Sequence, residues 1–241
     1  MSQGKPFSDG FSLVELLIAF FISMVLLTLL VQQLSAVSRQ YQRLHAVLEE
    51  TMTLQWVFDL VRSRIRHAGF TPCVGLDQLH ALDTRDEPEH LKAIELAYPL
   101  QPHVATRLVI RKMDETAFSF AEILDAYHLR VVACCFKMPA NAFVLIADCE
   151  HAEVHEVAQV GESIQLKKPL VFHYAKEVYV GPWVSEAFFL KPGKGLLIQQ
   201  HRVDHIMPLK QLEFQLENTT VIMRVVTMLG QQALLKERFR M

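Results

Sequence analysis

The fold of this chain is decided by one apolar stretch, FSLVELLIAFFISMVLLTLLV (Phe11–Val31). No charged residue occurs between Glu15 and Arg39. As an α-helix, ~20 residues at ~1.5 Å per residue cover the ~30 Å hydrocarbon core of a bilayer. A buried helix of a soluble protein normally keeps a polar stripe, and the few polar residues here do not form a wide one. The stretch is therefore predicted to be a membrane-inserted helix.

Composition sets the broad class of the protein. The chain has 241 residues, of which 51% are hydrophobic and 21% charged, and its formal net charge is −2. This content excludes intrinsic disorder as the main state, because disorder requires low hydrophobicity and high net charge. The balance of 24 Lys and Arg against 26 Asp and Glu gives no electrostatic basis for nucleic-acid binding, so no nucleic-acid partner is expected.

Glu15 is the most informative residue of the apolar stretch. A carboxylate inside hydrocarbon costs about 2–3 kcal/mol even on lenient insertion scales, so such a residue tends to be paired or functional. One interpretation is that Glu15 lies near the membrane interface and extends its carboxylate toward water. The other is that it pairs with a cation at similar depth. An amino group freed on Phe11 by cleavage after Gly10 would supply that cation, one helical turn away or on a neighbouring subunit.

The residues from Gly10 to Glu15 resemble a known processing signal. Gly-Phe-Ser-Leu-Val-Glu before a membrane-length apolar core is similar to the class III signal of type IV prepilin-like proteins. The resemblance implies that a prepilin peptidase cuts after Gly10 and N-methylates Phe11. It also implies that Glu15 is the assembly carboxylate. The helix would serve first as a membrane anchor and then as the core of a filament.

The helix is expected to continue to Ala68, because no Pro or Gly interrupts residues 11–68. Gly69 suits a left-handed C-cap, and the basic residues of the last turn complement the helix dipole. The second half carries an apolar stripe that should pack against a sheet. The stripe consists of Val47, Leu54, Phe58, Val61, Ile65 and Ala68, with Thr51 between. The expected organisation is a leader (1–10), an apolar helix (11–31), an amphipathic continuation (32–68) and a globular domain (69–241).

The globular domain is predicted to be mainly strand, and a helix followed by strands without βαβ alternation indicates an α+β fold. The expected architecture is a long N-terminal helix packed on an antiparallel, pilin-like sheet. A short helix is expected at Glu89–Leu96. The expected strands are Thr106–Lys112, Leu129–Lys137, Ala142–Cys149, Glu153–Val160, Ser163–Lys167, Glu177–Val184, Ala187–Leu190, Gly195–Arg202, Lys210–Glu217 and Thr220–Leu229.

Four cysteines, Cys73, Cys134, Cys135 and Cys149, are candidates for disulfides if the domain lies outside the cytoplasm. Cys134 and Cys135 are adjacent on a predicted strand, so their side chains point to opposite faces and a bridge between them would be strained. A turn at Lys137–Asn141 would bring Cys149 opposite this pair. The prediction is a bridge from Cys149 to Cys134 or Cys135, and buried free thiols are the alternative.

Two further segments resemble one subgroup of the prepilin-like family. Arg64–Cys73 (RIRHAGFTPC) is similar to the helix end of PilW-type minor pilins, and Phe143–Cys149 (FVLIADC) resembles that group's apolar strand ending in Asp-Cys. Gln211–Leu229 is similar to C-terminal strands of both PilW-type minor pilins and J-type minor pseudopilins of type II secretion. The Ala-Gly segment and the cysteines favour the pilus group.

The resemblance to PilW-type minor pilins implies a role in initiation and assembly of a type IV pilus, at the filament tip. The implied location is the inner membrane as a single-pass protein with a periplasmic C-terminal domain, and then the pilus at the cell surface. Implied partners are the prepilin peptidase, other minor pilins, the major pilin and the inner-membrane assembly machinery.

One row of residues suggests metal or enzyme chemistry. Cys149, His151, Glu153 and His155 alternate, so a strand would place all four on one face, and all are ligand types for transition metals. Such a row is more often the solvated face of an antiparallel strand, which is the preferred interpretation. The chain has no H-E-x-x-H, phosphate-loop or G-x-S-x-G motif. No enzyme activity, metal or cofactor is therefore expected; a membrane-anchored binding or enzymatic domain is the alternative.

Overall fold

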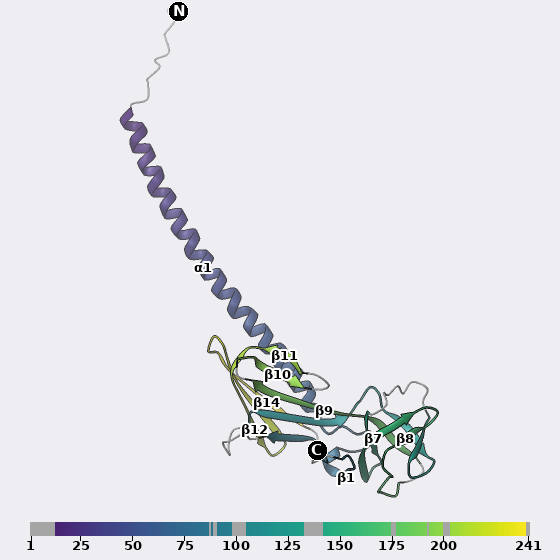
Figure 1. Cartoon of the computed structure of the whole chain (residues 1–241). Helices are drawn as coiled ribbons and strands as arrows, with labels where there is room; N and C mark the ends of the chain where they lie inside the picture. Colours follow the sequence, from purple (N-terminus) through teal and green to yellow (C-terminus); the bar gives the residue numbers. More distant parts are fainter. Residues whose placement is uncertain are drawn as a thin grey trace, which may run out of the picture. The chain divides into compact units, whose positions relative to one another are not determined.

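The computed structural model describes residues 13–86, 88, 91–97, 105–132, 142–174, 177–191, 193–199 and 203–239. It contains one long helix, α1 (Leu13–Arg66), followed by a strand-rich region (Figure 1). By its internal contacts the chain divides into two units, Met1–Met52 and Thr53–Met241, so α1 contributes to both. The predicted α+β class, a long N-terminal helix and a sheet domain rich in antiparallel strands, is confirmed.

Helix α1 ends at Arg66, two residues before the predicted end. Gly69 follows with φ +68°, the left-handed conformation that glycine adopts without strain. Its N–H donates to the carbonyl of Arg111 at 2.8 Å, so the chain leaves the helix directly onto a strand. A Cβ on Gly69 would lie 2.6 Å from that of Ala93. Both the backbone angle and the close approach therefore require glycine here.

The buried stripe of α1 is shorter than the sequence predicts. Leu54, Val57, Val61 and Ile65 are buried. Val47, which the helical spacing assigned to the same stripe, is 40% exposed. That assignment was wrong because Val47 belongs to the first unit, in which the described helix side chains are mostly exposed. Periodicity identified an apolar row but not the point at which packing begins.

A short 3₁₀-helix, η1 (Leu76–Gln78), and fourteen described strands complete the structure. The first seven strands are β1 (His80–Asp83), β2 (Ile94–Ala97), β3 (Arg107–Met113), β4 (Ser119–Ile123), β5 (His128–Val131), β6 (Phe143–Ala147) and β7 (His151–Val160). The other seven are β8 (Ile164–Leu166), β9 (Glu177–Lys191), β10 (Gly195–Gln199), β11 (Val203–Met207), β12 (Leu209–Glu217), β13 (Thr220–Thr227) and β14 (Gln232–Arg238).

Strand β9 organises the larger sheet because its 15 residues serve two regions. Its first part pairs with β4 and β6, and its second part pairs with β3 and β10. β7 and β8 lie near one end of β9, and β10 and β11 near the other (Figure 1). A separate three-stranded sheet is formed by β12, β13 and β14.

Six strands close into a small barrel. The pairing runs from β9 through β4, β5, β8, β7 and β6 and returns to β9, and every pair is antiparallel. Closure removes free edges from this part of the sheet. A cluster of small and branched apolar side chains gathers among these strands. Its buried members are Ala121, Leu129, Val144, Ile146, Val157, Ile164, Leu166, Val178 and Val180.

A second core joins the end of α1 to the rest of the sheet domain. Leu54, Val57, Val61 and Ile65 share one buried cluster with Phe188 of β9 and with residues of β3, β10 and the three-stranded sheet. A third cluster packs η1 and β1 against the outer side of β6 and β7. The helix end is thus an integral part of the domain core.

Several predicted strands are wrong in detail. The helix expected at Glu89–Leu96 is contradicted, because Ile94–Ala97 is strand β2 and pairs with β3. The two strands expected at Glu177–Val184 and Ala187–Leu190 are one strand, since the polar Ser185 and Glu186 between them stay in the ladder opposite β3. β14 was missed because its sequence, QALLKER, lacks β-branched and aromatic residues.

Candidate functional site

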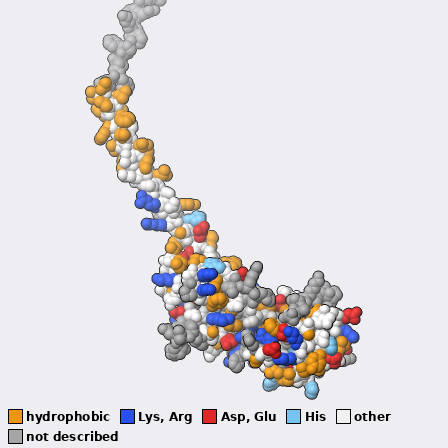
Figure 2. Space-filling model, viewed as in Figure 1, with side chains coloured by type: hydrophobic (Ala, Val, Ile, Leu, Met, Phe, Trp, Pro, Cys, Tyr) orange, Lys and Arg blue, Asp and Glu red, His pale blue; other side chains and the backbone are white. Residues whose placement is uncertain are grey.

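The first part of α1 presents apolar side chains on every side. From Leu13 to Val31 its large hydrophobic residues are exposed, and Figure 2 shows them gathered along this part of the helix. Among the described residues, α1 is the one helix long and apolar enough to cross a membrane. A contiguous exposed surface of this kind marks contact with lipid or with other protein. The helix is therefore the candidate functional site.

Glu15 lies in the first turn of α1, and its side chain is exposed. A carboxylate in this position complements the positive end of the helix dipole. Gly10, Phe11 and Ser12 lie outside the described residues. Cleavage after Gly10, methylation of Phe11 and pairing of Phe11 with Glu15 therefore stay predictions.

Two other polar residues of the apolar stretch, Ser23 and Thr28, are satisfied within the helix itself. The hydroxyl of Ser23 donates to the carbonyl of Ala19 at 2.8 Å, and that of Thr28 donates to the carbonyl of Met24 at 2.8 Å. Such bonds to the preceding turn hide the hydroxyls from an apolar surrounding. This arrangement leaves Glu15 as the one charged group along the apolar surface.

Ion pairs fasten the other end of α1 to the sheet domain. Glu237 of β14 accepts hydrogen bonds from Arg62 Nε at 3.0 Å and Arg66 Nε at 2.8 Å. Arg64 NH1 lies 3.3 Å from Glu186 Oε1 of β9. The sequence suggested only that these arginines complement the helix dipole. Arg62 also pairs with Asp59, one helical turn away. Glu237 and Glu186 lie more than 100 residues away in sequence, so no local pattern could identify them.

Glu186 is buried in the middle of β9, with only 1% of its surface exposed. Burial raises the pKa of its carboxyl, and the nearby charges of Arg64 and Lys112 oppose that rise. Within the described part of the chain neither of its oxygens has a hydrogen-bond partner. The end of α1 therefore contacts two different carboxylates. Glu237 accepts hydrogen bonds from two arginines, whereas Glu186 interacts with Arg64 and Lys112 mainly through charge.

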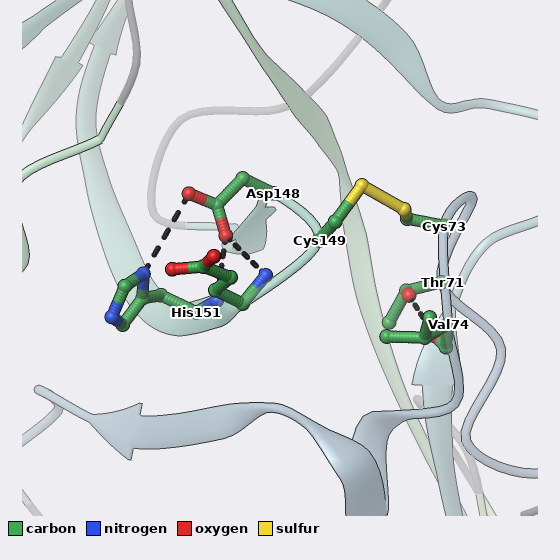
Figure 3. Close-up of a disulfide and its surroundings, with 7 residues drawn as sticks. Thr71, Cys73, Val74, Asp148, Cys149 and His151 are labelled. Atoms are coloured by element: carbon green, nitrogen blue, oxygen red, sulfur yellow. Dashed lines mark hydrogen bonds and ion pairs between the residues drawn. A yellow bond between two sulfur atoms is a disulfide. The ribbon is translucent and has the colours of Figure 1, made fainter.

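One disulfide, between Cys73 and Cys149, ties the segment after α1 to the turn between β6 and β7 (Figure 3). The Cα atoms are 5.3 Å apart. The predicted bridge from Cys149 to Cys134 or Cys135 is therefore wrong. It assumed a hairpin across Lys137–Asn141, but in the part of the chain that the structure describes, β5 pairs with β4 and β8, and β6 pairs with β7 and β9. Cys134 and Cys135 themselves lie outside the described residues.

The turn that carries Cys149 is held by its neighbours. Asp148 accepts hydrogen bonds from the backbone N–H groups of Glu150 at 2.7 Å and His151 at 2.6 Å (Figure 3). On the other side of the bridge, the Thr71 hydroxyl donates to the carbonyl of Val74. Both cysteines thus sit in locally fixed segments, which suits a structural disulfide.

The row Cys149, His151, Glu153 and His155 is not the solvated face that the sequence suggested. Glu153 and His155 are fully buried, because they lie opposite Ile146 and Val144 of β6, two members of the cluster among the barrel strands. His155 Nε2 and Glu153 Oε2 are 2.6 Å apart. Cys149 is taken up by the disulfide. In the described part of the chain, no three His, Cys, Asp or Glu side chains are placed to hold a metal.

Glu153 instead fixes a loop of the barrel. Its carboxylate accepts hydrogen bonds from the backbone N–H groups of Phe172 at 2.6 Å and Val171 at 3.0 Å. Burial alone would raise the pKa of Glu153, but the bond to His155 and these backbone bonds outweigh it, and the pKa is lowered. Glu153 is therefore a structural carboxylate. Sequence alternation placed it on the correct strand but could not show what covers that face.

Comparison with known protein families, with curated proteins and with solved structures gives no match for this chain. The features of the chain that bear on function are the exposed apolar surface of α1 and the attachment of its C-terminal end to the sheet domain.

Proposed function

We propose that this chain is a type IV prepilin-like subunit, a PilW-type minor pilin that takes part in initiating and assembling a pilus. The proposal places the sheet domain in the periplasm of a single-pass inner-membrane protein, and later at the filament tip. Its proposed partners are the prepilin peptidase, other minor pilins, the major pilin and the inner-membrane assembly machinery.

The observation that carries the proposal is the continuity of α1. One helix continues from an exposed apolar segment to a segment with one stripe buried in the core of the sheet domain. A simple anchor needs only the apolar segment, followed by a linker of any kind. A subunit that packs its helix into a filament needs the helix to be held by the domain, as the ion pairs to Glu237 and Glu186 do.

The disulfide supports the periplasmic part of the proposal. Disulfides persist in oxidising compartments such as the bacterial periplasm and are rare in the cytosol. The Cys73–Cys149 bridge joins the segment after α1 to the turn between β6 and β7 and is part of the domain's structure. A helix that spans the membrane would therefore have its C-terminal side in the oxidising compartment.

The proposed mechanism is physical and involves no catalytic step by this chain. Lipid solvates the surface of residues 11–31 before assembly, and neighbouring helices replace that lipid during assembly through van der Waals packing. Glu15 is expected to pair with the amino group of a processed Phe11, on its own or a neighbouring helix. In a low-dielectric surrounding such a pair fixes the axial register of the helices.

The experiment compares Glu15→Ala with Glu49→Ala, which removes a carboxylate outside the apolar stretch. Glu15→Ala is expected to abolish incorporation into pili while the protein still inserts in the inner membrane, and Glu49→Ala to leave incorporation unchanged. Immunoblots of sheared pili and of membrane fractions measure both. Normal incorporation of Glu15→Ala would reject the proposal in favour of a simple anchor.

The same preparations test processing. Mass spectrometry of the mature protein is expected to find N-methyl-Phe11 at the N-terminus. A chain that still begins at Met1 in cells with an active prepilin peptidase contradicts the prepilin assignment. If Glu15→Ala instead stops protein secretion and leaves pili intact, the chain is a J-type minor pseudopilin of type II secretion.

A further inference from the structure

Beyond Val31 the sequence of α1 contains polar residues again, and the apolar residues between them form a row along the helix. Leu34, Val37, Tyr41, Leu44 and Leu48 follow steps of three and four residues. They lie in the first unit, and each is between 53 and 71% exposed. None of them belongs to the three hydrophobic clusters of the domain. We call these five residues the heptad stripe.

The heptad stripe lies outside the segment that a bilayer covers. The ~20 residues needed to cross the hydrocarbon core are supplied by the stretch that ends at Val31. At ~1.5 Å per residue the stripe extends roughly 22 Å further along the helix. Contiguous apolar surface of this kind in water marks an interaction site. Neither the membrane nor the domain core accounts for it.

The spacing specifies what kind of partner fits. Alternating steps of three and four residues place Leu34, Tyr41 and Leu48 at the a positions of a heptad, and Val37 and Leu44 at the d positions. This is the seam by which one α-helix packs against another at a small crossing angle. The partner surface is therefore a helix with the same repeat.

The charges next to the seam indicate which helix this is. The flanking e and g positions carry no Lys, Arg, Asp or Glu; they are Gln33, Ser38, Gln40, His45 and Val47. The charged residues Arg39, Arg43, Glu49 and Glu50 fall at the f, c, b and c positions, away from the seam. Two parallel copies would therefore bring no like charges together across the interface. Copies inserted in one membrane in the same orientation are parallel by construction.

We propose that the heptad stripe pairs with the same stripe of a second copy of this chain, forming a parallel helix pair just outside the membrane. The proposal needs only a membrane-anchored chain and does not depend on the pilin assignment. Fewer than three heptads are marginal for a free peptide, because isolated short helices gain too little from packing. Anchoring both helices in one bilayer raises their effective concentration and offsets this weakness.

The experiment uses the full chain in inner-membrane vesicles and single added cysteines. Val37→Cys and Leu44→Cys lie at the seam, whereas Arg39→Cys and Ala46→Cys lie at the f position on the opposite side of the helix. Mild oxidation followed by non-reducing electrophoresis measures covalent dimer, and the unmodified chain gives the background from native cysteines. The seam variants are expected to form roughly tenfold more dimer than the f-position variants.

A second variant separates specific pairing from random collision. Leu44→Glu, combined with Val37→Cys, places two carboxylates across the seam and is expected to reduce the dimer to the f-position level. The exposed position of Leu44 makes this change compatible with the domain fold. Equal dimer at seam and f positions, insensitivity to Leu44→Glu, or cross-linking only to a different protein would each overturn the proposal. None of these results bears on the Glu15 and Phe11 tests of pilin function.

Discussion

The two halves of α1 have the same helical backbone conformation but differ in how far their side chains are buried. From Leu13 to Met52 the helix is mostly exposed, whereas from Leu54 to Ile65 one stripe is fully enclosed by the domain core. Both halves contain many apolar residues, and charged residues are more frequent in the second half. The second half packs against strands of the domain in one buried cluster, and its arginines pair with Glu237 and Glu186. Helix formation is local, but burial is decided by distant partners.

The largest expected effect is a loss of stability of the sheet domain that encloses the second half of α1. The change that causes it lies outside the first half of the helix. Replacing both bridge cysteines, Cys73→Ser and Cys149→Ser, should lower the free energy of unfolding of the domain by about 4 kcal/mol, because the bridge closes a long loop in the unfolded chain. The bridged residues are 76 apart in sequence. Denaturant titration of the detergent-solubilised full chain, followed by tryptophan fluorescence, measures the loss. An unchanged midpoint would mean that the bridge contributes no stability to the domain.

A matched pair of isoleucines compares the two halves directly. Ile65 is 0% exposed and Ile22 is 52% exposed. Ile65→Ala should cost about 3 kcal/mol of domain stability, since it leaves a cavity in a close-packed core. Ile22→Ala should leave domain stability unchanged, because its side chain is exposed and belongs to none of the three hydrophobic clusters of the described residues. Similar losses for both variants in the same titration would contradict the division of the helix.

The smallest expected effect concerns the barrel, and it depends on pH. Glu153→Gln should cost about 2 kcal/mol near pH 7, since an amide cannot accept all the hydrogen bonds of the buried carboxylate. The pKa of Glu153 is lowered in the folded protein, so its contribution is present above the unfolded pKa and is lost as pH falls through the folded pKa. Stabilities of the wild type and of Glu153→Gln should therefore converge on acidification. A constant difference between the two from neutral to acid pH would show that ionisation of Glu153 is not involved.

The sequence predicted α1 well because its signals are local. These signals are a membrane-length apolar run, the absence of Pro and Gly, and a glycine just beyond the helix end. In the structure this glycine, Gly69, has φ +68°. The hydroxyls of Ser23 and Thr28 donate to carbonyls of the preceding turn, which is a local interaction of the same kind.

The barrel and the disulfide were not predictable in the same way. Closure depends on pairing β5 with β8 and β6 with β9, strands that are not neighbours in sequence. The assumption that successive strands form a hairpin led to the wrong partner for Cys149. The surroundings of Glu153 were wrong for another reason: barrel closure buries the face of β7 that an open antiparallel sheet would leave to solvent. Arg62 and Arg66 were recognised as a basic helix end, but their shared partner Glu237 lies in a strand that the sequence did not reveal.

The bridge between Cys73 and Cys149 also has a mechanical consequence. Cys73 follows the end of α1 closely, so tension applied along the helix reaches the β6–β7 turn through a covalent bond instead of through the intervening strands. The 76 residue steps between the two cysteines could span about 260 Å if stretched at ~3.4 Å each. With the bridge intact, a force that pulls on the helix cannot extend the residues between the two cysteines.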